Sequence, residues 1–141
     1  MQFLQGHTKD IRAVAYTPDG RLISGGSDRT VRVWAPLAGT CLQTLKARTV
    51  VYAVAVSPDG KLLAFAGRQP ASGPGPNTIK FWDLEHGQSE DEIVWDVPDN
   101  FPRYYTSRSI WYLTFSSDGQ YLAAACRSPG SANILYGAGG H

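Results

Sequence analysis

Three tight turns of the same kind recur along this 141-residue chain, each flanked by short apolar runs. The turns read Thr17-Pro18-Asp19-Gly20, Ser57-Pro58-Asp59-Gly60 and Ser116-Ser117-Asp118-Gly119. Proline presets φ for the second position of a type I turn, and glycine accepts the positive φ at which the chain enters the next strand. Each turn therefore predicts a β-hairpin, and their recurrence predicts a repeat protein.

A third apolar run follows two of these hairpins and includes a tryptophan near its end, Trp34 in the first unit and Trp82 in the second. The predicted strands are short, and apolar residues show no sustained 3.6-residue period, so the fold class is all-β. The predicted strands cover residues 11–16, 21–25, 30–34 and 41–45, then 51–56, 61–66, 78–82 and 93–97, and finally 110–115, 120–126 and 133–136.

The first unit begins with Gly6-His7, continues through the two turn-linked strands with Ser24, then Asp28, and closes on Trp34. In this order, and at this repeat length, the chain resembles the WD40 β-propeller family over nearly its whole length. The resemblance implies about three four-stranded antiparallel blades, too few to close a ring. The expected division is residues 1–45 (with 1–4 as the last strand of a preceding blade), 46–97 with a loop insertion at 68–77, and 98–141 as a long crossing and an incomplete third blade.

His7, Ser24 and Asp28 are the residue types of a nucleophilic catalytic triad. The resemblance implies a different role: with Trp34 they correspond to the structural tetrad of a WD40 blade. Such a chain of buried polar groups is stable when every member has its partner. The set is therefore interpreted as a clamp within the first blade, and no catalytic residue is assigned.

The other two blades depart from this pattern. Counting from the Asp-Gly turns aligns Ser24 with Ala64 and Ala123, neither of which carries a hydroxyl group. Gly137 stands where a third blade requires tryptophan. Only the first blade is expected to complete its tetrad.

The repeat spacing also locates two insertions. One lies between the second and third strands of the second blade, and the other lies in the crossing into the third blade. Because strands alternate in direction, both insertions emerge at the same end of the blades. The crossing contains Arg103, Tyr104, Tyr105 and Arg108, residue types enriched at interface hot spots, which predicts a partner-binding surface. Packing of these aromatics onto the third blade is the alternative.

The overall charge favours no particular class of charged partner. With 13 basic and 12 acidic residues the net charge is +1, which favours neither nucleic acid nor a membrane surface, and no apolar run is long enough to span a bilayer. Cys41 and Cys126 fall in different repeats and are expected to be free, buried thiols. The scattered histidines and cysteines lack zinc-site spacing, so no metal or cofactor is expected. The expected location is the cytoplasm.

These observations predict a non-catalytic scaffold for protein partners, formed by part of a larger propeller. Further blades could come from the same chain or from another copy. Two alternatives remain open: the propeller portion of a multidomain enzyme, fused to a kinase or protease domain, or a subunit that completes a ring by homo-oligomerisation.

Overall fold

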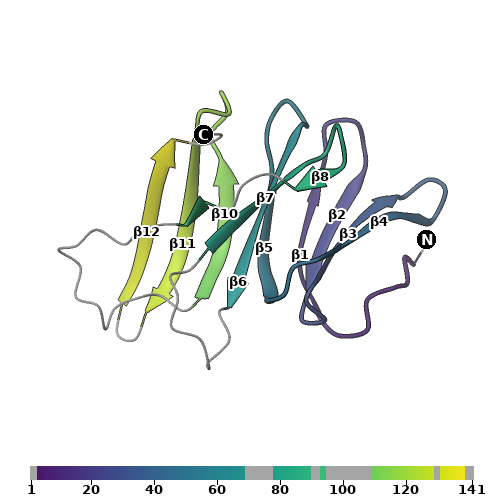
Figure 1. Cartoon of the computed structure of the whole chain (residues 1–141), viewed down its shortest axis with the longest axis horizontal. Coiled ribbons are helices and arrows are strands. Elements are labelled where there is room, and N and C mark those ends of the chain that lie inside the picture. The colour runs from purple at the N-terminus through teal and green to yellow at the C-terminus, as the bar shows by residue number, and fades with distance from the viewer. Residues whose placement is uncertain (1–2, 69–77, 90–92, 95–108, 129–130, 139–141) are drawn as a thin grey trace.

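The computed structural model describes residues 3–68, 78–89, 93–94, 109–128 and 131–138. The described residues form antiparallel sheets arranged side by side in an open arc (Figure 1). The first sheet has the order β1-β2-β3-β4, with bounds β1 Ile11–Tyr16, β2 Leu22–Gly26, β3 Thr30–Ala35 and β4 Thr40–Lys46. All four strands lie where the sequence predicts them, within one residue at either end.

The second group of strands surrounds β6 and β7. Its bounds are β5 Val50–Val56, β6 Leu62–Arg68, β7 Thr78–Asp83, β8 Gln88–Ser89 and β9 Ile93–Val94. The predicted fourth strand at 93–97 is only partly found: β9 pairs with the start of β7, β8 pairs with its end, and residues 95–97 lie outside the described residues.

The third group contains β10 Ser109–Phe115, β11 Tyr121–Ser128 and β12 Ser131–Ala138. A single residue pair, Ser109 with Arg68, joins β10 to β6, so the second and third groups form one continuous hydrogen-bonded sheet. Gly137 lies opposite Leu122, just as Trp34 lies opposite Leu22 in the first sheet. Glycine therefore occupies the tryptophan position of the third group, as predicted.

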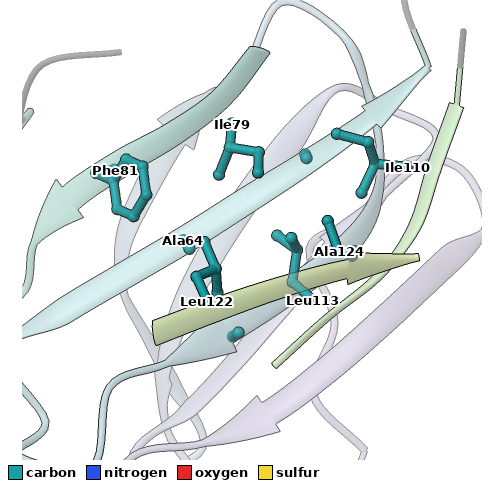
Figure 2. Packing of buried hydrophobic residues seen from close by; sticks show 10 residues of the cluster. Ala64, Ile79, Phe81, Ile110, Leu113, Leu122 and Ala124 are labelled. Atoms are coloured by element: carbon teal, nitrogen blue, oxygen red, sulfur yellow. The ribbon is translucent and has the colours of Figure 1, made fainter. Parts of the chain in front are cut away.

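Two apolar clusters hold the arc together. The first lies between the first and second groups and includes Ile23, Val31 and Val51, which are fully buried. The second lies between the second and third groups, where Ile79, Ile110 and Leu122 meet (Figure 2). Each group thus buries its apolar residues against its neighbour, as expected for stacked repeats.

Each first strand carries a β-bulge at the same place. The pairing register shifts between Ile11 and Ala13 in β1, and at the matching positions of β5 and β10. The extra residues are Arg12, Tyr52 and Trp111, each seven positions before the aspartate of its own turn. A β-bulge changes the direction in which the side chain of its extra residue points. The three bulges therefore reorient the side chains at the same position of each first strand.

Candidate functional site

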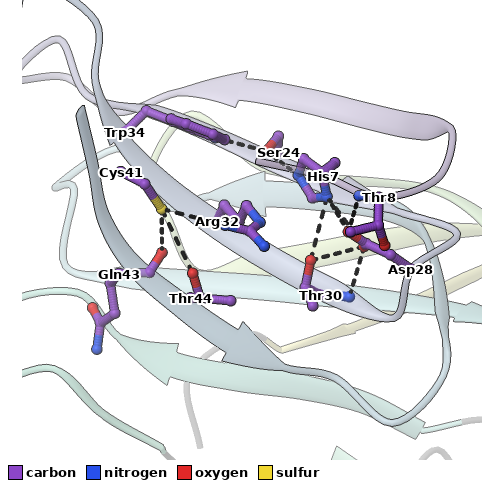
Figure 3. A network of polar contacts seen from close by, with 10 residues as sticks. All are labelled: His7, Thr8, Ser24, Asp28, Thr30, Arg32, Trp34, Cys41, Gln43 and Thr44. Atoms are coloured by element: carbon purple, nitrogen blue, oxygen red, sulfur yellow. Dashed lines mark hydrogen bonds and ion pairs between the residues drawn. The ribbon is translucent and has the colours of Figure 1, made fainter. Parts of the chain in front are cut away.

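The first blade brings His7, Ser24, Asp28 and Trp34 together in one hydrogen-bonded network (Figure 3). Trp34 Nε1 donates to Ser24 Oγ at 2.8 Å, and Ser24 Oγ lies 2.6 Å from His7 Nε2. His7 Nδ1 lies 2.9 Å from Asp28 Oδ2. The network thus joins β2, β3, the β2–β3 turn and the segment that precedes β1.

The chemistry of the donors sets the direction of this chain. An ionised Asp28 only accepts hydrogen bonds, so His7 carries a proton on Nδ1 and donates it to the carboxylate. With a neutral imidazole, Nε2 then accepts from the Ser24 hydroxyl, whose oxygen accepts from the Trp34 indole. Every polar group in the chain therefore has a partner.

Asp28 is held by more than His7. Its carboxylate accepts the Thr30 hydroxyl at 2.8 Å, the Thr30 amide at 3.1 Å and the Thr8 amide at 3.1 Å. Burial alone would raise the pKa of Asp28, but the hydrogen bonds from Thr30, Thr8 and His7 outweigh it and lower the pKa to about 2. Asp28 is therefore a charged anchor of the β2–β3 turn.

The same atoms differ from a working nucleophilic triad in two respects. Ser24 is only 3% exposed, and its oxygen already accepts the indole hydrogen of Trp34. A catalytic serine must present its oxygen to a substrate carbonyl. Burial and the Trp34 hydrogen bond close that approach in this arrangement.

Gly26 is required by the close packing beside this network. A Cβ atom added there would lie 2.7 Å from the Asp10 carbonyl oxygen and 3.3 Å from His7 Nδ1. Real Cβ atoms do not approach backbone so closely, so the position needs glycine.

The sequence alignment of the second and third blades with Ser24 was wrong. Ser24 lies opposite Val14 in the β1–β2 pair. The residues of β5 and β10 that correspond to Val14 lie opposite Phe65 and Ala124, not opposite Ala64 and Ala123. A one-residue shift in an antiparallel pair moves a side chain to the other face of the sheet. Ala64 accordingly packs in the cluster toward the third blade.

The cause is the length of the turns. In the first turn the Thr17 amide donates to the Arg21 carbonyl, whereas in the second the Ser57 amide donates to Leu62, one residue further along. The third turn closes like the second. Counting from the shared Asp-Gly pair misses this difference, because the extra residue lies after the glycine.

Trp82 shows the consequence of the missing hydroxyl. Its Nε1 is buried and has no hydrogen-bond partner among the described residues. Phe65 stands where Ser24 stands in the first blade, and a phenyl ring offers no acceptor of that kind. The second blade therefore keeps the tryptophan but not the bond that fixes it.

A second side-chain constellation lies on the bulge residues and was not predicted. The rings of Tyr52 and Trp111 stack with their centroids 4.6 Å apart and their planes 5° from parallel. The Arg12 guanidinium carbon lies 5.6 Å from the centroid of the Tyr52 ring. The three residues form a ladder across all three blades. Their identical offset from the turn aspartates was a signal available in the sequence.

Some of the predicted site residues are not described by the structure, and one predicted burial is wrong. Arg103, Tyr104, Tyr105 and Arg108 lie outside the described residues, as do residues 69–77 of the loop insertion. Cys41 is a free thiol but is exposed, contrary to the prediction, because its position near the start of β4 is on the solvent side.

The described residues contain neither a metal-binding cluster nor a membrane-spanning helix. No three His, Cys, Asp or Glu side chains in those ranges gather in a way that could hold a metal ion. The same ranges contain no helix with the length and apolar character that crossing a membrane would need.

The antiparallel sheets, their shared bulges and the buried network define a segment of a β-propeller repeat protein. The family model "WD domain, G-beta repeat" matches residues 1–35 and 39–83, more than half of the sequence. The chain belongs to the WD40 repeat family, which confirms the resemblance seen in the sequence.

The chain is also similar to several curated relatives. The chain is 33% identical over 129 residues to the small ribosomal subunit protein RACK1z of Arabidopsis thaliana, covering 84% of this chain and 37% of that protein. It is 32% identical over 120 residues to the small ribosomal subunit protein RACK1 of Caenorhabditis elegans. It is 40% identical over 63 residues to the ribosome biogenesis protein BOP1 homolog of Drosophila persimilis, of which it covers 8%. The chain thus spans little more than a third of the RACK1 relatives.

Proposed function

We propose that this chain is a non-catalytic scaffold on which protein partners assemble. The observation that carries the proposal is that the three residues of catalytic-triad type are buried in a structural network. His7, Ser24 and Asp28 are joined to Trp34 in a buried network, so they act as a clamp that keeps the first blade rigid. Rigid repeats that stack side by side offer an extended surface for partners.

The relatives support the same role. Two of them are named as proteins of the small ribosomal subunit and a third as a ribosome biogenesis protein, which are roles within large assemblies. By analogy we propose protein partners in an assembly, with a cytoplasmic location, and further blades supplied by the same chain or another copy. The blade boundaries proposed are residues 1–45, 46–97 and 98–141.

The binding surface proposed from sequence is the crossing that contains Arg103, Tyr104, Tyr105 and Arg108. The test is capture of partners from a lysate of the source organism on the immobilised full chain, with identification by mass spectrometry. The combined variant Arg103→Ala, Tyr104→Ala and Arg108→Ala should lose those partners and keep its melting temperature. Lys61→Ala, in a hairpin turn at the other end of the blades, is the control.

Two results would contradict this proposal. If the triple variant unfolds, the crossing belongs to the core rather than to a binding surface. Covalent labelling of Ser24 by a serine-directed probe in the folded chain would contradict the clamp and favour an enzyme.

A further inference from the structure

The small net charge conceals a separation of charge between the two ends of the blades. One end, here called the basic end, comprises the chain entering β1, the β2–β3 turn, the β4–β5 crossing and the last residue of β6. Its exposed cations are Lys9, Arg12, Arg29, Lys46, Arg48 and Arg68. Its only exposed carboxylate among the described residues is Asp10.

Hydrogen bonds place these segments side by side. The Ser27 amide donates to the Asp10 carbonyl at 2.8 Å, and the Ala47 amide donates to the Arg29 carbonyl at 2.9 Å. Lys46 pairs with Thr30 at the start of β3. The segments that carry these cations are therefore held together, and they lie along the lower edge of the arc in Figure 1.

The opposite end, here called the acidic end, carries the hairpin turns between first and second strands and the β7–β8 turn. Among the described residues its carboxylates are Asp19, Asp59, Asp83, Glu85 and Asp118, against the cations Arg21 and Lys61. Hydrogen bonds within these turns lower the pKa of Asp59 and Asp118, which keeps both charged. Each end therefore has its own sign of potential.

The cations of the basic end are available for a ligand. Among the described residues, only Arg12 of the six forms an ion pair, at 3.9 Å from Asp10, and Asp10 is 84% exposed. Four of the six are arginines, whose planar guanidinium groups bind carboxylates through two parallel hydrogen bonds.

The aromatic ladder lies at the same end. Arg12 Nε donates to Ser27 Oγ at 3.0 Å, which ties the ladder to the β2–β3 turn. Trp111, at its other end, is 43% exposed. An exposed tryptophan at the same end as several arginines matches the composition of a protein interface, where tryptophan and arginine are enriched.

We propose that the basic end is the docking surface for an acidic peptide segment of a partner protein, rich in aspartate or glutamate. This inference rests on the proposed scaffold function and names the chemistry of its partner. Single-stranded nucleic acid fits less well, because its bases stack on a succession of accessible aromatic faces. Here the Tyr52 ring is already engaged by both Arg12 and Trp111.

The test is fluorescence anisotropy of the full chain with three labelled probes: a peptide of alternating Glu and Gly, the same peptide with Gln for Glu, and a uridine oligonucleotide. The Glu peptide should bind at least about tenfold more tightly than the Gln peptide, and binding should weaken at about 0.5 M salt. Tighter binding of the oligonucleotide, or equal binding of the two peptides, would overturn the proposal.

Two charge-reversed variants with the same net charge localise the effect. Lys46→Glu with Arg68→Glu changes the basic end, and Arg21→Glu with Lys61→Glu changes the acidic end. The first should lose at least about tenfold in affinity for the Glu peptide and the second less than about twofold. Melting temperatures verify folding, and if either double variant fails to fold, the single changes Arg68→Gln and Lys61→Gln, which again share one net charge, replace the two. Equal losses in both variants would contradict a localised site.

The outcome separates this inference from the scaffold function. If captured protein partners bind the wild-type chain and the basic-end variant equally, the acidic-peptide inference fails and the scaffold function stands. If the Glu peptide binds as predicted, the inference is supported whether or not residues 103–108 take part.

Discussion

Tyr52 and Trp111, 59 positions apart in the sequence, stack with their ring planes 5° from parallel and their centroids 4.6 Å apart. Both are bulge residues, and their contact joins the second blade to the third. Aromatic pairs of this kind contribute about 0.5–1.5 kcal/mol beyond the area they bury.

A double-mutant cycle should detect this contact. Tyr52→Ala and Trp111→Ala, alone and together, should show a coupling free energy of about 0.5–1.5 kcal/mol in urea unfolding. The matched pair Tyr112→Ala with Tyr52→Ala serves as control, because Tyr112 lies beside Trp111 in sequence but makes no ring contact with Tyr52 among the described contacts. A coupling near zero for Trp111 would contradict the stack.

The two tryptophans should respond differently to the same substitution. Trp34→Phe removes the indole that donates to Ser24, whereas Trp82→Phe removes an indole nitrogen with no partner among the described residues. Trp34→Phe should therefore cost about 1–3 kcal/mol more in free energy of unfolding. Equal losses in chemical denaturation would show that the Ser24 bond adds nothing.

Truncation tests the clamp as a whole. Trp34→Ala should cost about 3–5 kcal/mol because it empties a buried site, and Ser24→Ala about 1–3 kcal/mol because it leaves partners unsatisfied. Thermal melts of both variants check this order. An unchanged melting temperature for Trp34→Ala would rule out the clamp.

The clamp should also make the stability of the fold depend on pH in the acidic range. The pKa of Asp28 is lowered to about 2 from its ordinary value of 3.8, so the carboxylate stabilises the fold above about pH 4, and that contribution is lost as the pH falls toward 2. The loss is up to about 2 kcal/mol. Asp28→Asn should be less stable than wild type at pH 6 and approach it at pH 2. Parallel pH profiles for the two proteins would argue against this account.

Gly67 is predicted to tolerate no side chain. A Cβ atom there would overlap the Val50 carbonyl oxygen, so Gly67→Ala must displace the pairing of β5 with β6. We expect a loss of a few kcal/mol in stability. Gly20→Asn is the control: a Cβ atom there meets no atom within 4 Å, and asparagine is among the residues that adopt a positive φ such as the 88° at this position, so its cost should be smaller. Similar melting temperatures for both variants would contradict the close packing.

The first blade exposes a face that the other blades bury. Ile11, Val14 and Tyr16 are 52%, 63% and 70% exposed. The residues in register with Ile11 and Val14 in the next blades are buried against a neighbour: Val51, Val54, Ile110 and Leu113.

The chain alone is therefore expected to self-associate through this face. Light scattering should detect aggregation or a discrete dimer, and Val14→Lys with Tyr16→Lys should reduce it. Leu42→Lys should have little effect, because Leu42 is 56% exposed but lies in β4, away from this face. A sharply melting monomer would contradict this expectation.

The sequence alone determined the hairpins, the family and the members of the network. An Asp-Gly turn determines the conformation of only the few residues around it, and Trp34 marks the end of the strand that contains it. Local chemistry was therefore enough to place β1 to β4. Gly137 was likewise correctly assigned to the tryptophan position, since spacing within one blade fixes it.

Only the tertiary structure decided which residues of different blades correspond and which meet. One extra residue after Gly60 shifts the register, so Phe65 rather than Ala64 takes the place of Ser24. The meeting of Arg12, Tyr52 and Trp111 and the gathering of charge at each end likewise depend on how strands stack. The register of a hairpin depends on how its turn closes, and blade packing joins residues that are far apart in the sequence, so a count along the chain contains neither.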